Sequence, residues 1–344
     1  MRILISTISD QPMPNYLLIK ELKDIDHYVF ITTQKMEAKG KCETLATTAG
    51  ITSERYTKVI VSENDLHQNL SKYTEVDVLN REEATYLVNV TGGTKLMSIG
   101  MWYYFSNRKN TEFYYVPFSA KGYEKVYSNK SAEFIEFTYF MGAEEYLNLH
   151  GMNCECKTEI KSDKWCNNVW QYLLKSEFNT QKLPLEFKNQ DGSINGNLYG
   201  DWFEQYIYLS IKRKLNLEDK YIKLGIKLKE INPTHTVESA MNDNEIDVLV
   251  LYKNQPFVIE CKTVHDPIKI KSTTLLNQMY KVASLNKRFG LSARSILITL
   301  AKLETLSEET RNNLRLKASL MGNIELFGNT DLQRNKIIQL IKNT

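Results

Sequence analysis

The chain has 344 residues, 42% of them hydrophobic and 25% charged, and a formal net charge of +3. This composition excludes an intrinsically disordered chain, and no stretch approaches the about 18 uninterrupted apolar residues of a membrane-spanning helix. The length predicts two domains, each able to bury its own core. The first ten residues lack the basic and cleavage regions of a signal peptide, so we expect a cytoplasmic protein.

Neither the charge nor the cysteines identify a partner by themselves. Residues 1–150 carry more acidic than basic side chains, so the basic excess lies in the rest of the chain. There it fits either a nucleic-acid partner or an ordinary solvated surface. The five cysteines suit a reducing compartment. Cys154, Cys156 and Cys166 form the only cluster in the sequence, and this cluster lacks the further ligands of a closed zinc site.

The N-terminal part alternates strand-like and helix-like segments. The apolar runs that we expect to be strands lie at residues 2–9, 27–33, 55–61, 86–93 and 112–119. Helices are expected between them, from about Gln34 and from about Asp65. Continuous apolar strands separated by helices predict a parallel sheet covered on both faces, that is, a doubly wound, Rossmann-like α/β domain.

Two of these strands end in chemically distinctive loops. Residues 6–15 (STISDQPMPN) are rich in hydroxyl groups and stiffened by two prolines, and residues 89–97 (NVTGGTKLM) place Gly92-Gly93 before Thr94 and Lys95. In parallel sheets ligands bind beyond the carboxyl ends of the strands, and helix N-termini offer N–H groups to anions. We therefore expect an anion or nucleotide site here. Ordinary turn and helix-cap chemistry is the alternative for the second loop.

A helical segment at residues 138–151 ends in glycine, which predicts a domain boundary near residue 150. We expect residues 1–150 to form the first domain and residues 196–344 the second. The segment 151–195 contains one expected helix and a stretch rich in turn residues, and we interpret it as a linker or helical connector.

The second domain carries charges inside apolar strands. Residues 245–263 (EIDVLVLYKNQPFVIECKT) read as two strands around a turn, interrupted by Asp247, Glu260 and Lys262. Side chains alternate along a strand, so a hairpin with an even loop places Asp247 opposite either Glu260 or Lys262, with all three on one face. Closely paired carboxylates favour a proton or a divalent cation such as Mg²⁺ or Mn²⁺. We expect Asp247 and Glu260 to bind that cation and Lys262 to orient water or neutralise charge on a phosphate. The alternative is a buried ion-pair network without a metal.

Three further residues are candidates for the same site. Glu204 lies in the preceding expected helix, where it would approach the cation. The alternative is that Asp201 and Glu204 form a capping box at the start of that helix. Glu245 shares the face of Asp247, and Gln278 lies in the helix that follows the hairpin.

The conjunction of these motifs resembles the CARF-domain ancillary nucleases of type III CRISPR systems. STISDQP and NVTGGTK correspond to the sensor loops, and Asp247, Glu260 and Lys262 correspond to a PD-(D/E)XK nuclease core, although Ile246 stands where a proline is frequent. The resemblance implies a Rossmann-like CARF domain with a parallel sheet and a restriction-endonuclease-like α/β/α nuclease domain.

The resemblance also implies partners and site residues. The CARF domain would form a homodimer that binds a cyclic oligoadenylate, typically cyclic tetra-adenylate, with cyclic hexa-adenylate as the alternative. The nuclease domain would cleave or nick DNA, RNA or both with Mn²⁺ or Mg²⁺, through Asp247, Glu260, Lys262 and Glu204. The residues implied at the activator are Thr7, Ser9, Asp10, Thr91, Gly92, Gly93, Thr94 and Lys95, with Thr32 and Thr33 as further contacts.

Two other functions fit parts of the sequence. A non-catalytic cyclic-nucleotide sensor that regulates transcription would need a recognition helix, which we do not find, and would not need the complete acid, acid and lysine set. A restriction or repair nuclease with a DNA-reading N-terminal domain would need a basic surface there, but residues 1–150 have an acidic excess. We therefore expect an allosteric nuclease.

Overall fold

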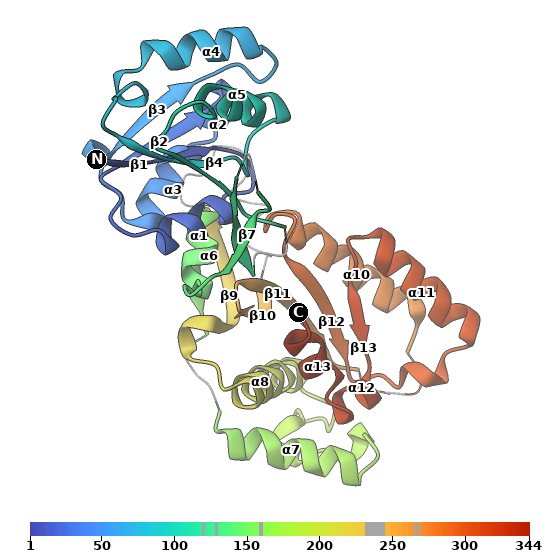
Figure 1. Ribbon diagram of the computed structural model, residues 1–344. Helices are drawn as coiled ribbons and strands as arrows, with labels where there is room; N and C mark the ends of the chain where they lie inside the picture. The colour runs from blue at the N-terminus through green and yellow to red at the C-terminus, as the bar shows by residue number, and fades with distance from the viewer. Residues whose placement is uncertain are drawn as a thin grey trace. The chain divides into compact units, whose positions relative to one another are not determined.

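The computed structural model describes residues 1–118, 121–127, 130–157, 161–230, 245–264, 266, 268 and 270–344. The chain divides into two compact units: residues 1–141 with 145–151, and residues 142–144 with 152–344 (Figure 1). Within the described ranges, no helix is both long enough and apolar enough to cross a membrane. Each unit is described separately below.

The first unit is built on a seven-stranded sheet with the order β3-β2-β1-β4-β5-β6-β7. Its strands are β1 (Arg2–Thr7), β2 (His27–Thr32), β3 (Tyr56–Ile60), β4 (Thr85–Asn89), β5 (Thr111–Tyr115), β6 (Gly122–Val126) and β7 (Glu133–Glu136). The strands β1 to β5 pair in parallel, while β6 and β7 join antiparallel. The order reverses between β1 and β4, so the carboxyl ends of these two strands form the switch point at which such sheets bind ligands.

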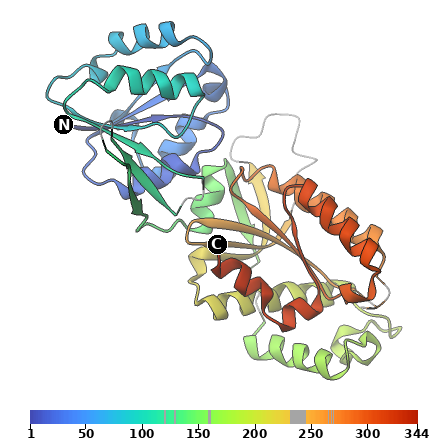
Figure 2. The ribbon, with the colours of Figure 1, turned by 45° about the vertical axis from the view of Figure 1, so that its right-hand side comes forward.

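Helices cover both faces of this sheet, as the sequence predicted (Figures 1 and 2). They are α1 (Met13–Glu21), α2 (Gln34–Ala38), α3 (Lys41–Ala49), α4 (Leu66–Glu75), α5 (Lys95–Phe105) and α6 (Ala143–Leu149). Side chains of α4 and α5, among them Tyr73 and Met101, form one core with Ile3 and Val29 of the sheet. Asp65 caps α4 by accepting a hydrogen bond from the Gln68 N–H, so the helix begins where the sequence placed it.

The second unit contains a six-stranded sheet with the order β13-β12-β11-β10-β9-β8. Its strands are β8 (Met152–Cys156), β9 (Ile222–Glu230), β10 (Glu245–Tyr252), β11 (Gln255–Lys262), β12 (Arg294–Thr299) and β13 (Glu325–Phe327). The strands β8 to β11 pair antiparallel, and β11 to β13 pair in parallel. This mixed sheet and its helices give the α/β architecture expected for a nuclease domain.

Two helical layers cover this second sheet. The helices are α7 (Asp163–Lys175), α8 (Gly196–Leu215), α10 (Ser272–Asn286), α11 (Glu308–Leu320), α12 (Asn329–Gln333) and α13 (Lys336–Lys342). Apolar side chains of α7, α8 and α13 share one core with Val248 and Ile259 of the hairpin. Leu297 of β12 packs with α10 and α11 in a separate core. The hairpin strands are therefore apolar on both faces, which agrees with their continuous apolar sequence.

All of the segment 151–195 except Gly151 belongs to the second unit, so it does not act as a simple connector. Residues 152–156 form β8, the edge strand paired with β9, and α7 buries Trp170 and Leu173 in the core shared with α8. Only Met152 of β8 is buried, so this strand depends on its pairing with β9, which lies far away in the sequence. That dependence explains why the segment looked like a connector.

The hairpin has an even loop, as expected, and its length is two residues. Lys253 and Asn254 have φ values of 49° and 65°, which is the conformation of a type I′ turn. The turn fixes the register Tyr252↔Gln255 to Val248↔Ile259. Of the two registers that the sequence allowed, the structure adopts the one in which Asp247 is opposite Glu260.

Candidate functional site

The loops after β1 and β4 meet at the switch point of the first sheet and are joined by a buried amide network. The Asn15 Nδ2 donates to the Thr7 carbonyl at 2.9 Å, and the Asn89 Nδ2 donates to the Asn15 Oδ1 at 2.7 Å. Both asparagines are at most 1% exposed. A Cβ added to Gly92 would lie 2.3 Å from the Thr7 carbonyl oxygen, so only glycine allows this close approach. The two loops are thus held together as one structural element.

The first of these loops presents a mixture of free and occupied groups. The Thr7 side chain is fully buried, and its hydroxyl has no hydrogen-bond partner in the described residues. The Ser9 hydroxyl accepts a hydrogen bond from the Gln11 N–H at 3.2 Å, which closes a local turn. Asp10 is exposed and pairs with Lys39, whose Nζ lies 2.7 Å away. The structure therefore places Thr7, Ser9 and Asp10 around one loop, with a basic residue beside them.

In the second loop, two threonines have structural roles. The Thr91 hydroxyl donates to the Asn89 Oδ1 at 2.6 Å and accepts from the Val116 N–H at 2.8 Å. Thr94 is the N-cap of α5 and accepts from the Met97 N–H at 3.3 Å. The alternative that the sequence left open, turn and cap chemistry, is thus present. Lys95 is exposed on the first turn of α5, where it is accessible to an anion at the N-terminus of that helix.

Thr32 and Thr33, which the sequence analysis named as further contacts to the activator, lie at the end of the neighbouring strand β2. Thr32 is fully buried. Thr33 caps α2 by accepting from the Met36 N–H and donates to the Glu63 Oε1 at 3.2 Å. Thr33 therefore serves as a helix cap, and the carboxyl end of β2 lies next to that of β1.

The second candidate site begins with the two buried carboxylates of the hairpin. Asp247 is 7% exposed and Glu260 is 5% exposed, and the register places them opposite each other on neighbouring strands. The Asp247 Oδ2 accepts a hydrogen bond from the Cys261 N–H at 2.6 Å. Two carboxylates are therefore brought together in a desolvated environment.

The electrostatics of this pair are unfavourable for two negative charges. Burial raises the pKa of Asp247 well above its usual range, and the negative charges of Glu260 and Glu204 raise it further. Burial also raises the pKa of Glu260, and the positive charges of Lys281 and Lys262 oppose this rise only in part. A site with this electrostatic character favours a bound cation.

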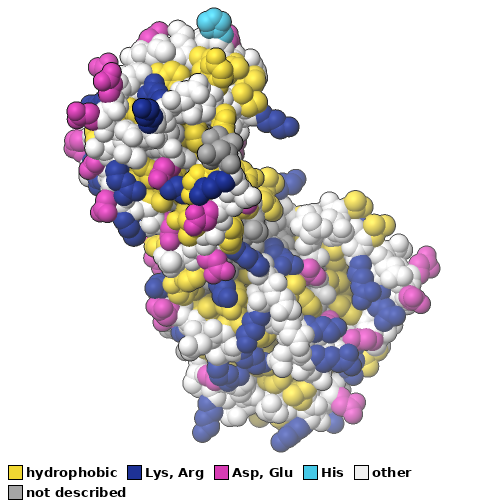
Figure 3. All heavy atoms as spheres, viewed as in Figure 1, with side chains coloured by type: hydrophobic (Ala, Val, Ile, Leu, Met, Phe, Trp, Pro, Cys, Tyr) yellow, Lys and Arg dark blue, Asp and Glu magenta, His cyan; other side chains and the backbone are white. Residues whose placement is uncertain are grey.

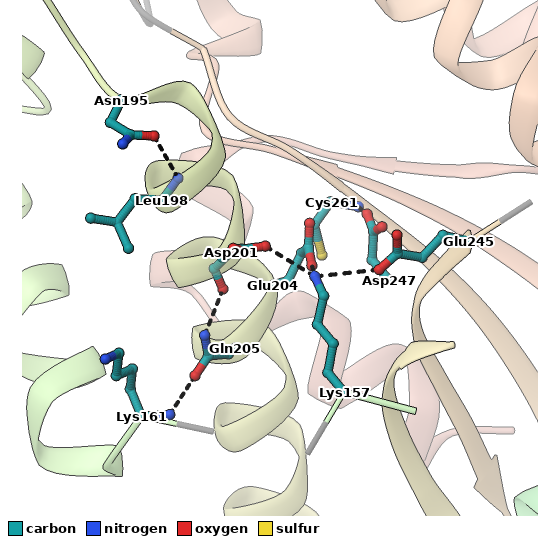
Figure 4. Close-up of polar contacts among 10 residues, drawn as sticks. All are labelled: Lys157, Lys161, Asn195, Leu198, Asp201, Glu204, Gln205, Glu245, Asp247 and Cys261. Atoms are coloured by element: carbon teal, nitrogen blue, oxygen red, sulfur yellow. Dashed lines mark hydrogen bonds and ion pairs between the residues drawn. The ribbon is translucent and has the colours of Figure 1, made fainter. Parts of the chain in front are cut away.

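Glu204 joins this site from α8. The helix is capped by Asn195, whose Oδ1 accepts from the Leu198 N–H, so Asp201 and Glu204 lie inside the helix. The capping-box alternative for these two residues is therefore wrong. Burial raises the pKa of Glu204, and the Lys157 ammonium opposes this effect. Figure 4 shows the Glu204 carboxylate turned toward Asp247 and Cys261.

Two lysines that the sequence analysis did not identify contact the acidic side chains. The Lys157 Nζ lies 3.0 Å from Asp201, 2.8 Å from Glu204 and 3.3 Å from Glu245. From α10, the Lys281 Nζ donates to the Glu260 Oε1 at 2.5 Å. The ion-pair network that the sequence offered as the alternative to a metal site is thus partly present, formed with lysines other than Lys262.

The other predicted residues occupy less central positions. Lys262 is half-buried at the end of β11, and its positive charge lowers the pKa of Glu260. Glu245 contributes to the site through its ion pair with Lys157. Gln278 is half-buried on α10, one turn before Lys281. It is Lys281 that contacts Glu260 from this helix, and nothing in the local sequence distinguishes it.

The donor set fits a hard divalent cation. Asp247 and Glu260 supply carboxylate oxygens, the ligands that Mg²⁺ and Mn²⁺ prefer, and burial raises the pKa of both carboxyl groups. Over the ranges that the structure describes, no group of three His, Cys, Asp or Glu side chains is arranged so that it could hold a metal ion by itself. A cation at Asp247 and Glu260 would therefore keep several water ligands, as Mg²⁺ usually does.

Models of two protein domains match the chain. The model of the Card1 CARF domain matches residues 3–146, and that of the Card1-like endonuclease domain matches residues 194–336. The chain belongs to this family of CARF-domain nucleases. The two matched ranges contain the switch-point loops and the hairpin, so each candidate site lies in the family domain that the sequence resemblance indicated.

Solved structures with the same fold cover nearly the whole chain. Can2 from Sulfobacillus thermosulfidooxidans, in complex with cyclic tetra-adenylate, is 17% identical with a TM-score of 0.73, and 99% of each chain is covered. The protein VC1899 from Vibrio cholerae is 15% identical with a TM-score of 0.69, covering 99% of this chain and 98% of its own. At these identities the likeness establishes the fold.

A third structure is larger than this chain. It is a type III CRISPR defence DNA nuclease activated by cyclic oligoadenylate, 17% identical with a TM-score of 0.57. The match covers 87% of this chain but 45% of that nuclease. A comparison with curated protein sequences gives no significant match.

Proposed function

We propose that this protein is a metal-dependent nuclease activated by a cyclic oligoadenylate in type III CRISPR antiviral defence. The observation that carries the proposal is the pair Asp247 and Glu260, buried and opposite each other in a domain of the Card1-like endonuclease family. Burying two carboxylates together costs several kcal/mol without a compensating charge. In a nuclease a bound metal ion would compensate the two charges. The structural likeness to Can2 and to the larger CRISPR nuclease supports the assignment as a nuclease.

The proposed activator is cyclic tetra-adenylate, with cyclic hexa-adenylate as the alternative ring size. Can2, which has the same fold, is known in complex with cyclic tetra-adenylate. In this chain the activator would contact the joined loops of β1 and β4, with Lys95 and the N-terminus of α5 facing phosphate groups. Thr7, whose buried hydroxyl has no partner in the described residues, adds a donor at the same edge.

A homodimer follows from the symmetry of this activator. A cyclic oligoadenylate presents the same phosphate groups around a ring, so two identical copies of the loops contact it on equal terms. Ligand binding would then change the activity by favouring one arrangement of the dimer through differential affinity. The described cysteines are all free, which fits the reducing cytoplasm expected for such a system.

The proposed catalytic group consists of Asp247, Glu260, Glu204 and Lys262. Asp247 and Glu260 would hold Mn²⁺ or Mg²⁺, which supplies Lewis acidity and lowers the pKa of a bound water. Glu204 adds a carboxylate from α8, and Lys262 supplies positive charge for a phosphate or a water. The substrate is DNA, RNA or both. Many Lys and Arg side chains lie on the face of the second unit that Figure 3 shows, in agreement with a polyanionic substrate.

One observation favours a second candidate, a non-catalytic sensor that regulates transcription through a nucleic-acid-binding module. Lys157 and Lys281 already neutralise several of the acidic side chains, as they would in a structural ion-pair network. Such a network would need no metal. It would not explain Lys262, however, which is not one of the lysines that form these ion pairs.

The test is a cleavage assay on the full chain with Mn²⁺ or Mg²⁺. Supercoiled plasmid, single-stranded DNA and single-stranded RNA are incubated with cyclic tetra-adenylate, with cyclic hexa-adenylate, and without activator. We expect activator-dependent cleavage by the wild type and a loss of at least about a hundredfold in Glu260→Gln.

The matched control is Glu325→Gln. Glu325 lies on β13 of the same sheet and pairs with Arg294 of β12, and it should be dispensable for cleavage. Equal cleavage by wild type and Glu260→Gln would refute the catalytic assignment. Cleavage that is equally fast without any activator would refute the sensor assignment instead.

A further inference from the structure

The side chain of Lys157 reaches the acidic site over a glycine. Gly225 of β9 has φ +55°, and a Cβ at this position would lie 2.3 to 2.8 Å from Cδ, Cγ and Cε of Lys157. The Lys157 N–H donates to the carbonyl oxygens of Leu224 and Gly225 at 3.1 and 3.2 Å. Both the backbone conformation and the space above Gly225 therefore favour glycine, and together they define the path of one lysine side chain.

The sheet register explains why the path crosses there. Continued by one residue, the pairing of β8 with β9 places Lys157 opposite Gly225, and that of β9 with β10 places Gly225 opposite Asp247. Glu260 follows in the same row on β11. Because Gly225 has no side chain, Lys157 can extend along the row toward the carboxylates.

At the end of this path, the ammonium group is surrounded like a bound cation. Asp201 and Glu204 of α8 and Glu245 of β10 lie 3.0, 2.8 and 3.3 Å from the Nζ. Figure 4 shows the three carboxylates converging on Lys157, with Asp247 beside Glu245. These residues come from two elements far apart in the sequence, so the arrangement is a product of the tertiary fold.

The charges of the described side chains indicate how many divalent ions the site can hold. Its carboxylates belong to Asp201, Glu204, Glu245, Asp247 and Glu260, and its lysines are Lys157, Lys262 and Lys281. When all are ionised, two negative charges remain, which one divalent cation neutralises. Without Lys157 there would be three, and three carboxylates around the former ammonium position would be uncompensated.

We propose that the Lys157 ammonium takes the place of a second metal ion, so that the nuclease site binds a single divalent cation. The inference rests on the proposed function, which supplies the first ion at Asp247 and Glu260. Two-metal nuclease sites hold their ions about 3.5–4 Å apart and share carboxylates between them. In this protein Glu204 would be the shared group, because its carboxylate pairs with Lys157 and is turned toward Asp247 (Figure 4). Lys157 is thus a positioning residue that acts through Glu204.

The test is the number of Mn²⁺ ions bound per chain, measured by electron paramagnetic resonance of free Mn²⁺ during titration of the full-length protein. We expect one ion in the wild type and two in Lys157→Met. Lys229→Met is the matched control, because it removes one lysine from an exposed pair with Glu155 on the neighbouring strand. This control should retain one ion.

A compensating double variant separates charge from misfolding. In Lys157→Met/Asp201→Asn a carboxylate is removed together with the lysine, so the second ion should bind at least about tenfold more weakly than in Lys157→Met, a difference of about 1.4 kcal/mol. Thermal melts verify that each variant is folded, and Lys157→Gln, which keeps a polar group of similar length, replaces Lys157→Met if the latter unfolds.

The possible results distinguish this inference from the proposed function. Two ions in the wild type, or one ion in every folded Lys157 variant, would overturn the role of Lys157 while leaving a metal-dependent nuclease intact. A wild type that binds no Mn²⁺, with Glu260→Gln unchanged from it, would overturn the metal site itself and the inference with it.

Discussion

At the residue scale, two of the three lysines in the proposed nuclease site, Lys281 and Lys262, act on the same carboxylate in different ways. Lys281 makes a direct contact of 2.5 Å with the buried Glu260, whereas Lys262 acts on the same carboxylate through its charge from the end of β11. Removing one partner of a buried ion pair leaves the other charge uncompensated, which is costly. A lysine that is held for chemistry can be removed at little cost in stability.

This difference predicts that one substitution lowers the cleavage rate and the other lowers the stability. Lys262→Met should lower cleavage by at least about a hundredfold with a change in unfolding free energy below about 0.5 kcal/mol. Lys281→Met should destabilise the protein by about 1–2 kcal/mol, because Lys281 is partly exposed and solvent screens some of the pair. Urea unfolding and the plasmid assay measure the two effects. Lys72→Met, in an exposed pair on α4, is the control and should change neither.

The result that would contradict this division of roles is a Lys262→Met variant that cleaves at the wild-type rate. In that case the positive charge needed by the phosphate would have to come from Lys281. The double variant would then lose the remaining cleavage, and the assignment of Lys262 would be withdrawn.

Sequence alone could identify the hairpin residues but not the lysines that surround them. Asp247 and Glu260 interrupt apolar strands, and an even turn leaves few registers, so their convergence follows from local rules. Lys157 directly follows β8 and Lys281 lies on α10, and both meet the acids through long-range packing. Gly225, a glycine inside a strand in which apolar and charged residues alternate, was the one signal in the sequence that another group approaches there.

At the scale of elements, the proposed activator site depends on the contact between the end of β1 and the turn before α5. Gly92 allows the turn to approach the Thr7 carbonyl, and Asn15 and Asn89 connect the two strand ends. From local chemistry the sequence predicted a glycine-containing turn, the helix after it and the switch point. It could not predict that the Thr91 hydroxyl accepts a hydrogen bond from the Val116 N–H, because that contact links the ends of β4 and β5.

Gly92→Ala should therefore separate the two loops. Its Cβ would meet the Thr7 carbonyl oxygen at 2.3 Å, so the turn must shift, and we expect a loss of about 1–3 kcal/mol in unfolding free energy. Cyclic tetra-adenylate affinity, measured by isothermal titration calorimetry, should fall at least about tenfold. The control is Gly200→Ala in α8, where a Cβ meets no atom within 4 Å.

Gly200→Ala should bind the activator like the wild type and unfold at the same or a higher denaturant concentration, since alanine favours a helix. If Gly92→Ala keeps the wild-type affinity, the joined loops are not the activator site, even if the variant is less stable.

At the scale of the whole molecule, the two sites lie in separate compact units, and the proposed function requires them to be coupled. The first unit has an acidic excess, so its affinity for a polyanionic activator must come from local groups such as Lys95 and helix N-termini and not from a general positive field. The basic excess lies in the second unit, where the substrate would bind. Activator and substrate therefore depend on different lysines, and their effects can be separated experimentally.

Lys95→Ala provides this separation. Lys95 is exposed at the first turn of α5 and has no place in the nuclease unit, so its loss should weaken activator binding without altering the chemistry. We expect the concentration of cyclic tetra-adenylate for half-maximal cleavage to rise about tenfold, equivalent to about 1.4 kcal/mol, while the rate at saturation stays within about twofold of the wild type.

Lys109→Ala, an exposed lysine just before β5 at the opposite end of the strands, is the control and should leave both quantities unchanged. An unchanged half-maximal concentration in Lys95→Ala would remove Lys95 from the activator site, and a lower plateau would mean that Lys95 also takes part in transmitting the signal between the units.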